Sequence, residues 1–218
     1  MYSWVRGLTK NALQGCFPSG SFLWRLPKES RAIALTFDDG PHPDYTPQIL
    51  DLLFREGCKA TFFVIGKHVK QYPKLVKRIA DDGHALGVHG YEHLEIVGLS
   101  AQSLTDELNN CRLAIREASG IDTTLFRPPR GKVSGLSALR VMKQGYCLVH
   151  WSKTYSDYNK DGVDKLVARI EADPMCSGDI ILLHDHNQYT VDALATVIPR
   201  VRAEGMQFQT INLKYLKT

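Results

Sequence analysis

Two adjacent carboxylates are the first residues of this chain whose types and spacing suit hydrolytic chemistry. Asp38 and Asp39 directly follow an apolar run. Because the side chains of a strand alternate between its faces, the two can point in different directions. One could then bind a metal ion while the other transfers a proton. The alternative is an ordinary solvated turn, since Asp-Asp-Gly is common in turns.

Two histidines lie four residues apart, at His89 and His93, just after a second apolar run. On a helical turn, residues at this spacing share one face, so both imidazoles could reach the same ion. Two histidines and one carboxylate form a zinc-binding set that leaves a coordination position open. The alternative for this pair is two exposed loop histidines.

Two more polar segments follow apolar runs. The segment His184–His186 contains two histidines, although a lone histidine at a strand end is more often structural. The segment Arg127–Gly131 contains Pro128 and Pro129, which fix φ and restrict the residue before each proline. A turn of this stiffness suits a backbone that must hold an N–H group in one place.

Short runs rich in β-branched and aromatic residues alternate with longer amphipathic segments from residue 31 onward. The short runs predict seven strands, at Arg31–Phe37, Lys59–Ile65, His84–Val88, Thr124–Arg127, Tyr146–Trp151, Asp179–Leu183 and Gln207–Asn212. The amphipathic segments predict helices at Thr46–Glu56, Val69–Asp82, Ala101–Ser119, Ser134–Gln144, Val163–Ala172 and Val191–Glu204. This alternation indicates an α/β fold in which crossover helices join parallel strands.

The positions of the polar residues favour a barrel over an open doubly wound sheet. Five of the predicted strands end in, or are directly followed by, a polar or aromatic side chain: Asp38-Asp39, His89, Arg127, Trp151 and His184. In α/β barrels, the rim at the carboxyl ends of the strands gathers active-site residues from several strands. We therefore expect these side chains to meet at one rim of a barrel of about seven parallel strands.

Composition indicates one globular domain and limits the classes of partner. The chain has 218 residues, of which 44% are hydrophobic and 23% are charged. The net charge of +4 is spread along the chain, so we expect no nucleic-acid partner. Five cysteines, an odd number without a Cys-x-x-Cys pair, indicate buried thiols in a reducing compartment. The chain has no run of 18 apolar residues, so we expect no membrane-spanning helix.

The first 29 residues form a segment before a single catalytic domain, which we place at residues 30–218. Apolar residues recur at helical spacing and predict a short helix packed on the domain: Met1, Trp4, Val5, Leu8 and Ala12. The alternative is a peripheral membrane contact through residues 1–14. Because Arg6 and Lys10 interrupt the apolar core that a signal peptide needs, we expect a cytoplasmic location, with or without membrane association.

Four motifs occur in a fixed order along the chain: Thr36–Pro41, His89-x-x-x-His93, Arg127-Pro128-Pro129-x-Gly131 and Leu182-x-His184. Together they resemble the successive signatures of polysaccharide deacetylases, also known as NodB-homology domains or family 4 carbohydrate esterases. The resemblance covers roughly residues 30–215. It implies a distorted (β/α) barrel with fewer than eight full repeats. It also implies metal-dependent hydrolysis of the N-acetyl group of an amino sugar, in a glycan or a lipid-linked saccharide (EC 3.5.1.-).

The resemblance also implies a role for each residue of the metal site. Asp39, His89 and His93 look like the ligands of one divalent metal ion. Zinc is the expected ion, although cobalt and nickel accept the same ligands.

The acid and base follow from the same resemblance. Asp38 looks like the general base, and Arg127 like the residue that holds its carboxylate in place. His184 looks like the general acid, and Asp157 could tune it. The metal and the backbone N–H of Arg130 would stabilise the oxyanion.

Two positions depart from the family pattern and bear on the substrate. Asp157-Tyr158 stands where relatives usually carry Asp-Trp, and Tyr158 is a smaller stacking platform. Arg130 stands where relatives often carry an aromatic residue, and its guanidinium could bind an anionic group of the glycan. Pro129 and Leu182 belong to the motifs that would line the substrate site.

Two other functions fit parts of this pattern. A related hydrolase of the same fold could cleave a small cyclic amide or imide, but such relatives generally lack the complete Asp-Asp and His-x-x-x-His set. A non-catalytic glycan-binding domain would be expected to lack Asp38 or His184, and both are present.

Overall fold

The computed structural model describes residues 20–26 and 31–213. Within these ranges nine strands form one sheet, and every pair of neighbours is parallel. The strands are β1 (Phe22–Leu23), β2 (Ala32–Asp38), β3 (Thr61–Val64), β4 (Ala85–Val88), β5 (Leu125–Phe126), β6 (Cys147–Val149), β7 (Lys153–Thr154), β8 (Ile180–His184) and β9 (Gln207–Phe208). Their order is β1-β6-β5-β4-β3-β2-β8-β7, and β9 pairs with β2. Among the described residues the order has two ends, so the barrel is incomplete.

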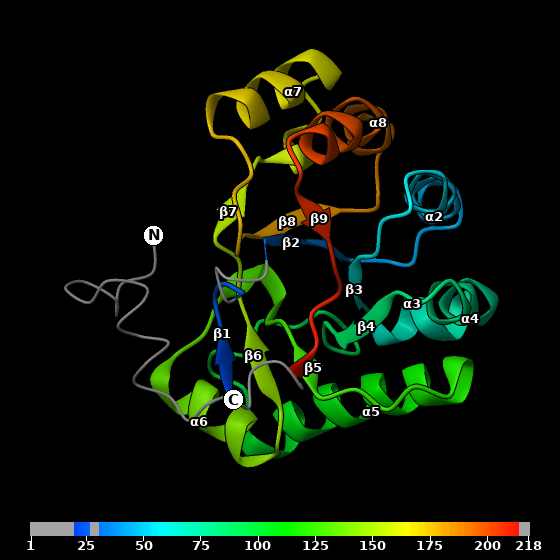
Figure 1. Cartoon of the computed structure of the whole chain (residues 1–218). Coiled ribbons are helices and arrows are strands. Elements are labelled where there is room, and N and C mark those ends of the chain that lie inside the picture. Colours follow the sequence, from blue (N-terminus) through cyan, green and yellow to red (C-terminus); the bar gives the residue numbers. More distant parts are fainter. Residues whose placement is uncertain (1–19, 27–30, 214–218) are drawn as a thin grey trace.

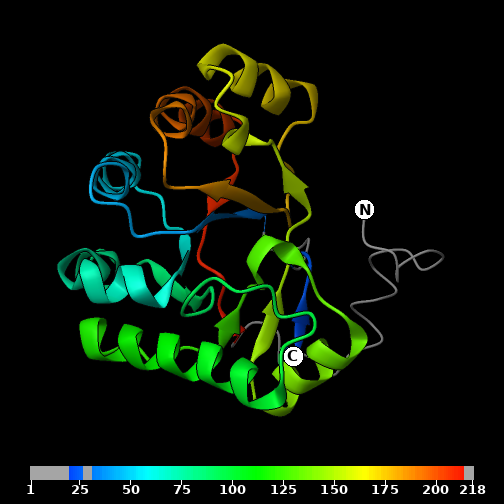
Figure 2. The ribbon, with the colours of Figure 1, turned by 180° about the vertical axis from the view of Figure 1, so that it is seen from behind.

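Helices lie on the outside of the strands, as Figures 1 and 2 show from opposite sides. The α-helices in the described ranges are α2 (Tyr45–Arg55), α3 (Gly66–Gln71), α4 (Pro73–Asp81), α5 (Ala101–Ser119), α6 (Gly135–Lys143), α7 (Val163–Ala172) and α8 (Gln188–Ala203). The distorted parallel barrel that we predict is therefore confirmed. The count of seven strands was too low because β1 and β7 contain two residues each, too few to show a periodic pattern.

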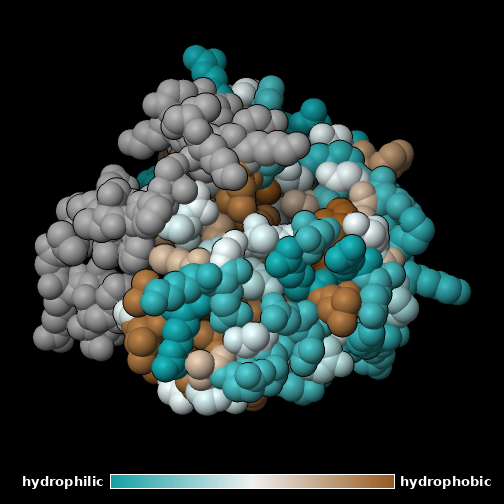
Figure 3. Space-filling model, turned by 90° about the horizontal axis from the view of Figure 1, so that it is seen from below, coloured by the Kyte–Doolittle hydropathy of each residue, from teal (hydrophilic) through white to brown (hydrophobic). Residues whose placement is uncertain are grey.

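The core lies between the strands and the surrounding helices. Every residue of β2 is buried, because helices cover one side of the strand and neighbouring side chains fill the other. Each helix turns one stripe inward; α5, for example, buries Leu104, Leu108 and Cys111. The face seen from below, where α5 and α6 lie in Figure 1, is mostly hydrophilic with interrupted hydrophobic patches (Figure 3).

Capping residues explain two helix boundaries. The Ser100 side chain accepts a hydrogen bond from the backbone N–H of Ser103 and begins α5, which ends at Gly120 with φ at 76°. Asn187 caps α8 in the same manner, through the N–H of Thr190. The helix therefore begins three residues before our predicted start at Val191.

The helix predicted over Val69–Asp82 is wrong as a single element. It is two helices, α3 and α4, which meet at Tyr72-Pro73. Proline has no N–H to donate and disfavours helical angles in the residue before it. Tyr72 accordingly has φ −127° and ψ 52°, outside the helical region.

The predicted meeting of the strand ends at one rim is confirmed. Asp38 on β2 is directly opposite His184 on β8 in the register of the sheet. Val88 at the end of β4 is opposite Phe126 of β5, so the residues that follow them also lie near each other.

Two predictions concern the start of the chain: a short helix and a domain boundary at residue 30. The predicted helix of residues 1–12 lies outside the described residues. β1 lies before the domain boundary that we place at residue 30, and it adds to the sheet by pairing with β6. No helix in the described part of the chain is long and apolar enough to cross a membrane.

Candidate active site

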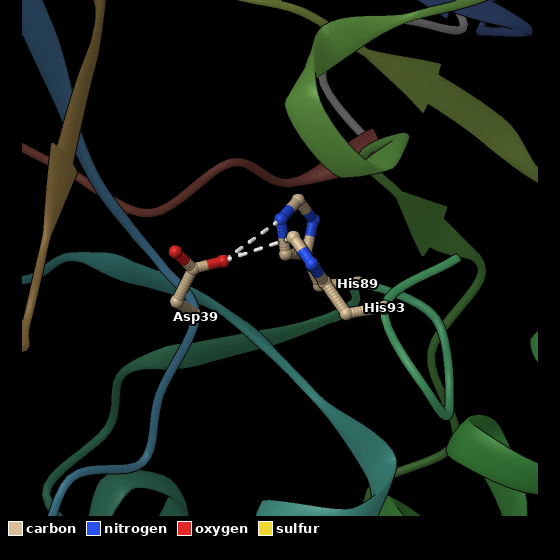
Figure 4. Close-up of side chains that lie close together, drawn as sticks. All are labelled: Asp39, His89 and His93. Carbon is tan, nitrogen blue, oxygen red and sulfur yellow. Dashed lines mark ion pairs between the residues drawn. The ribbon is translucent and has the colours of Figure 1, made fainter. Parts of the chain in front are cut away.

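Asp39, His89 and His93 converge at the rim, as Figure 4 shows. One carboxylate oxygen of Asp39, Oδ1, lies 3.3 Å from Nε2 of His89 and 3.2 Å from Nε2 of His93. Asp39 comes directly after β2 and His89 directly after β4. The three potential ligand atoms all lie within 4.8 Å of one another, which suits binding to one ion.

The two histidines meet through a loop, so the helical turn that we predict for their spacing is wrong. No helix covers residues 89–93. His89 continues the parallel ladder, because its backbone N–H donates to the carbonyl of Val64. Gly90 then has φ at 83° and His93 has φ at 62°, and these left-handed residues return His93 toward Asp39.

The hydrogen bonds around the cluster fit a metal-ligand set. Nδ1 of His89 donates to the backbone carbonyl of Arg127 at 2.9 Å, which leaves the lone pair on Nε2, the atom nearest Asp39. Burial would raise the pKa of Asp39. When the imidazoles are protonated instead, their hydrogen bonds to the carboxylate outweigh burial and hold the pKa of Asp39 well below its usual range. The cluster therefore offers one anionic oxygen and imidazole nitrogens.

Asp38 is buried beside this cluster and is held by Arg127. The Arg127 guanidinium, itself fully buried, donates from Nη1 to Oδ1 of Asp38 at 2.7 Å. The same nitrogen lies 2.6 Å from Oγ1 of Thr36, and Nη2 donates to the carbonyl of His150. The other oxygen of Asp38, Oδ2, lies 3.8 Å from Nε2 of His89. One oxygen is thus engaged by a fixed cation, while the second is on the side of the histidine cluster.

His184 faces the same rim and is held by Asp157. Its Nδ1 lies 2.9 Å from Oδ1 of Asp157, and its backbone N–H donates to Oδ2. Oγ1 of Thr190 also donates to Oδ2 of Asp157. Burial lowers the pKa of His184, but the hydrogen bond and charge of Asp157, aided by the charges of Asp38 and Asp39, raise it to about 9. These carboxylates therefore favour the protonated form of the ring.

The residues that we expect to touch the substrate occupy different environments. Pro129 and Arg130 form a short 3₁₀ turn with Gly131, and Arg130 has φ at 55°. The Arg130 side chain is 66% exposed and donates to Oε1 of Glu95 at 2.6 Å. Tyr158 is 52% exposed, and its ring meets that of His184 edge-on. Leu182 is buried within β8.

Several side chains that hydrogen-bond the site residues were not predicted from the sequence. Thr36 bonds Arg127, Thr190 bonds Asp157, and the buried carboxylate of Glu107 accepts backbone N–H groups of the histidine loop. Asp185 accepts a hydrogen bond from Thr46 at 2.5 Å. Thr36 and Asp185 lie inside sequence motifs that indicate an active site. Glu107 and Thr190 lie outside those motifs, and no sequence pattern marks them.

Comparison with known proteins identifies the family. The family model for "Polysaccharide deacetylase" matches residues 25–149, more than half of the chain. This chain belongs to the polysaccharide deacetylase family. Among the relatives of this deacetylase, a peptidoglycan-N-acetylglucosamine deacetylase from Bacillus cereus is 36% identical over 200 residues, which are 89% of this chain and 93% of the relative. A chitooligosaccharide deacetylase from Rhizobium leguminosarum bv. trifolii is 32% identical over 197 residues, which are 84% and 91% of the two chains.

A solved structure agrees with this assignment over nearly the full length. The crystal structure of the Bc1960 peptidoglycan N-acetylglucosamine deacetylase, in complex with 4-naphthalen-1-yl-N-oxidanyl-benzamide, matches with a TM-score of 0.85 at 28% identity. The match covers 94% of this chain and 95% of the other. This deacetylase is therefore a carbohydrate N-deacetylase, a hydrolase that removes acetyl groups from amino sugars.

Proposed function

We propose that this deacetylase binds one divalent cation, zinc, through Asp39, His89 and His93, and that Asp38 and His184 act as general base and general acid. One observation carries this proposal. The register of β2 and β8 pairs Asp38 with His184, and each is held by a partner of opposite charge beside the ligand cluster. When bound, the cation would polarise the acetamide carbonyl and offset the negative charge that develops on its oxygen. Cobalt and nickel are alternative ions for this donor set.

The base role fits the asymmetric surroundings of Asp38. Arg127 engages Oδ1, so Oδ2 is the oxygen that would take the proton of the attacking water. Because the guanidinium is fixed by further hydrogen bonds to Thr36 and His150, it holds the carboxylate in one orientation. Positioning of this kind reduces the entropy lost on reaching the transition state.

The acid role fits the raised pKa of His184. Because Nδ1 is engaged by Asp157, the proton on Nε2 is the one that the ring would donate to the departing amine. Asp157 is a positioning residue in this proposal, since it touches His184 and not the reacting atoms. The products would be acetate and a free amino sugar.

We assign oxyanion stabilisation to the backbone N–H of Arg130, together with the cation. The turn that carries this group is stiff, because Gly131 donates to the carbonyl of Pro128 and Lys132 donates to that of Pro129. A backbone N–H serves this role whatever the side chain is, so arginine in place of an aromatic residue is compatible with catalysis. Pro129 would line the same side of the substrate site, and Tyr158 would provide a stacking surface near His184.

The substrate that we propose is an N-acetylated glycan that carries an anionic group. Arg130 and Lys132 both contact Glu95, so this cluster of three residues has one net positive charge at the surface. An anionic substrate group would compete with Glu95 for the guanidinium. Arg130→Ala should therefore raise KM for a uronic-acid-containing or phosphate-linked acetamido sugar and leave KM for a neutral chitooligosaccharide unchanged. Equal changes in both would remove Arg130 from substrate selection.

We also propose a cytoplasmic location, with a peripheral membrane contact through residues 1–14. Among the described cysteines, Cys58, Cys111 and Cys147 are buried as we predict, whereas Cys176 is exposed. A cytoplasmic enzyme would meet lipid-linked precursors at the membrane face, where residues 1–14 would make a peripheral contact. Sedimentation with anionic lipid vesicles, with and without residues 1–14, tests that contact; equal sedimentation of both forms would refute it.

The central proposal is tested by measuring acetate release from peptidoglycan fragments, chitooligosaccharides and lipid-linked acetamido sugars. We expect release by the wild type, loss on treatment with a chelator, and recovery on addition of Zn²⁺, Co²⁺ or Ni²⁺. The Asp38→Asn variant should bind the ion and release acetate about 10²–10⁴-fold more slowly. Release that survives both chelation and Asp38→Asn would refute the mechanism.

A further inference from the structure

The loop between the two histidines is held from one side by the start of α3. The backbone N–H of Gly66 donates to the carbonyl of Gly90 at 3.0 Å, and that of Lys67 donates to the carbonyl of Tyr91 at 3.2 Å. Gly66 permits this close approach, because a Cβ there would lie 2.3 Å from Cδ2 of Tyr91. The carbonyl groups of the loop are thus fixed by one neighbouring element.

The loop is also held by the side chain of Glu107 on α5. Oε2 of Glu107 accepts the N–H of Tyr91 at 2.9 Å, and both of its oxygens lie 3.1 Å from the N–H of Glu92. A Cβ at Gly90 would lie 2.8 Å from Oε2, so the carboxylate also packs closely against the loop. The N–H groups of Tyr91 and Glu92 are therefore both held by this one carboxylate.

The loop needs such support because its backbone is strained. His93 has φ at 62°, in the left-handed region that a residue with a Cβ seldom adopts. Conformations of this kind persist only where the surroundings enforce them. The hydrogen bonds to α3 and to Glu107 are the contacts that hold the loop in this conformation, with the His93 imidazole beside Asp39.

The burial of Glu107 is hard to explain by packing of the helix alone. It is only 6% exposed and lies on the face of α5 that also buries Leu104, Leu108 and Cys111. Burying a carboxylate among apolar side chains costs free energy unless hydrogen bonds compensate it. An apolar residue would serve the helix–sheet contact without that cost. The carboxylate is explained by the N–H groups that it accepts.

We propose that Glu107 is a positioning residue of the metal centre, which fixes the loop between His89 and His93 and so sets the place of the His93 imidazole. This inference rests on the proposed function, because it takes both histidines as ligands. Glu107 acts through the backbone of Tyr91 and Glu92 and touches neither the ion nor the substrate. Supporting groups of this kind are typically worth a factor of about 10–100 in metal affinity.

The test is the affinity of the purified protein for Zn²⁺ alone, measured by competition with a chelating dye after circular dichroism has verified the fold. We expect about 10–100-fold weaker Zn²⁺ binding for Glu107→Leu, which keeps the apolar contacts of α5. Glu107→Gln should give a smaller loss, because one acceptor oxygen remains. With Co²⁺ as the probe, the visible absorption of the Glu107→Leu complex should also change, since one histidine is displaced.

Asp179→Asn provides the matched control. Asp179 is likewise a buried carboxylate that accepts a backbone N–H, that of Cys176 at 2.8 Å, but it directly precedes β8 and so lies at the end of that strand away from His184. A purely structural contribution of Glu107 would make the two sets of variants alike, with lowered unfolding temperature and wild-type Zn²⁺ affinity. We expect that behaviour of Asp179→Asn alone.

The outcomes separate this inference from the function on which it rests. If Asp39→Asn loses Zn²⁺ while Glu107→Leu and Glu107→Gln keep wild-type affinity, the positioning role is overturned and the metal site stands. If Asp39→Asn also keeps wild-type affinity, both are overturned. Should Glu107→Leu not fold, Glu107→Gln and Gly90→Ala perturb the same contact, and unchanged Zn²⁺ affinity in both would overturn the role of Glu107.

Discussion

Replacing Asp157 by asparagine should move the alkaline limit of activity to lower pH. Asp157→Asn preserves the shape of the side chain but removes the charge that, aided by those of Asp38 and Asp39, raises the pKa of His184 from 6.5 to about 9. That rise corresponds to about 3 kcal/mol in favour of the protonated ring, at about 1.4 kcal/mol for each pKa unit. Without the charge, burial dominates, and the pKa should fall to its ordinary value or below.

The consequence for the rate follows from the fraction of His184 that is protonated. At pH 8, a pKa of about 9 leaves about nine-tenths of the acid protonated, whereas an ordinary pKa leaves about 3%. We therefore expect kcat/KM of Asp157→Asn to be about 30-fold lower than that of the wild type at pH 8 and nearly equal to it at pH 6. The assay is initial-rate acetate release between pH 6 and pH 10 at saturating metal.

A bound cation adds positive charge near His184 in both proteins, so the displacement of the alkaline limb is more informative than its absolute position. Asp161→Asn is the matched control, because Asp161 lies in the same loop and pairs with Arg169 instead of His184. An alkaline limb at the same pH in wild type and Asp157→Asn would refute the reasoning. It would mean either that Asp157 does not control the proton or that His184 is not the acid.

The other predictions concern the metal site and the buried pairs around it. Asp39→Asn should lose bound metal, whereas Asp38→Asn should keep it and lose about 10²–10⁴-fold in rate; equal metal loss, measured by elemental analysis, would contradict separate roles. Arg127→Met should lower the free energy of unfolding in urea by about 3–5 kcal/mol, because Asp38 is left as an unpaired buried charge, and a loss below 1 kcal/mol would argue against that pair. Gly40→Ala should destabilise by about 1–3 kcal/mol in the same assay, since its Cβ would lie 2.2 Å from Oδ2 of Asp185; unchanged stability would show that Asp185 moves aside. His184 adds a pH dependence: its folded pKa is raised, so its stabilisation is complete below pH 6.5 and should disappear as pH rises through about 9, which unfolding curves at pH 6 and pH 9.5 would detect.

The gathering of Asp38, Asp39, His89, Arg127 and His184 could be predicted from the sequence, because each lies at the carboxyl end of an apolar run. Parallel strands bring those ends to the same edge, whatever the lengths of the intervening helices. The strand order and the pairing of Asp38 with His184 required the structure, since periodicity does not specify which strands are neighbours.

Other features left no local signal. Glu107 lies in an amphipathic helix, where a single glutamate looks like a surface residue, and only the fold shows that it is buried against a loop 15 residues earlier. The spacing of His89 and His93 correctly indicates that the two imidazoles lie together, yet left-handed backbone angles bring them there instead of a helical turn. The sequence predicts that Arg130 binds an anionic substrate group, and in the structure its guanidinium forms an ion pair with Glu95.

The buried contacts of Arg127 suggest which residues of this enzyme can change during evolution and which cannot. Its guanidinium crosses the interior from the end of β5 to Thr36 and Asp38 of β2 and to the carbonyls of Val149 and His150, 22 to 91 residues away along the chain. The residue that we propose to orient the base therefore also connects strands that are not neighbours in the sheet, so a mutation there should disturb both the base and the packing of the barrel. Exposed side chains of the rim loops can be substituted with less effect on the packing of the strands. New glycan preferences should accordingly arise by drift in those loops, while the reaction itself is inherited unchanged.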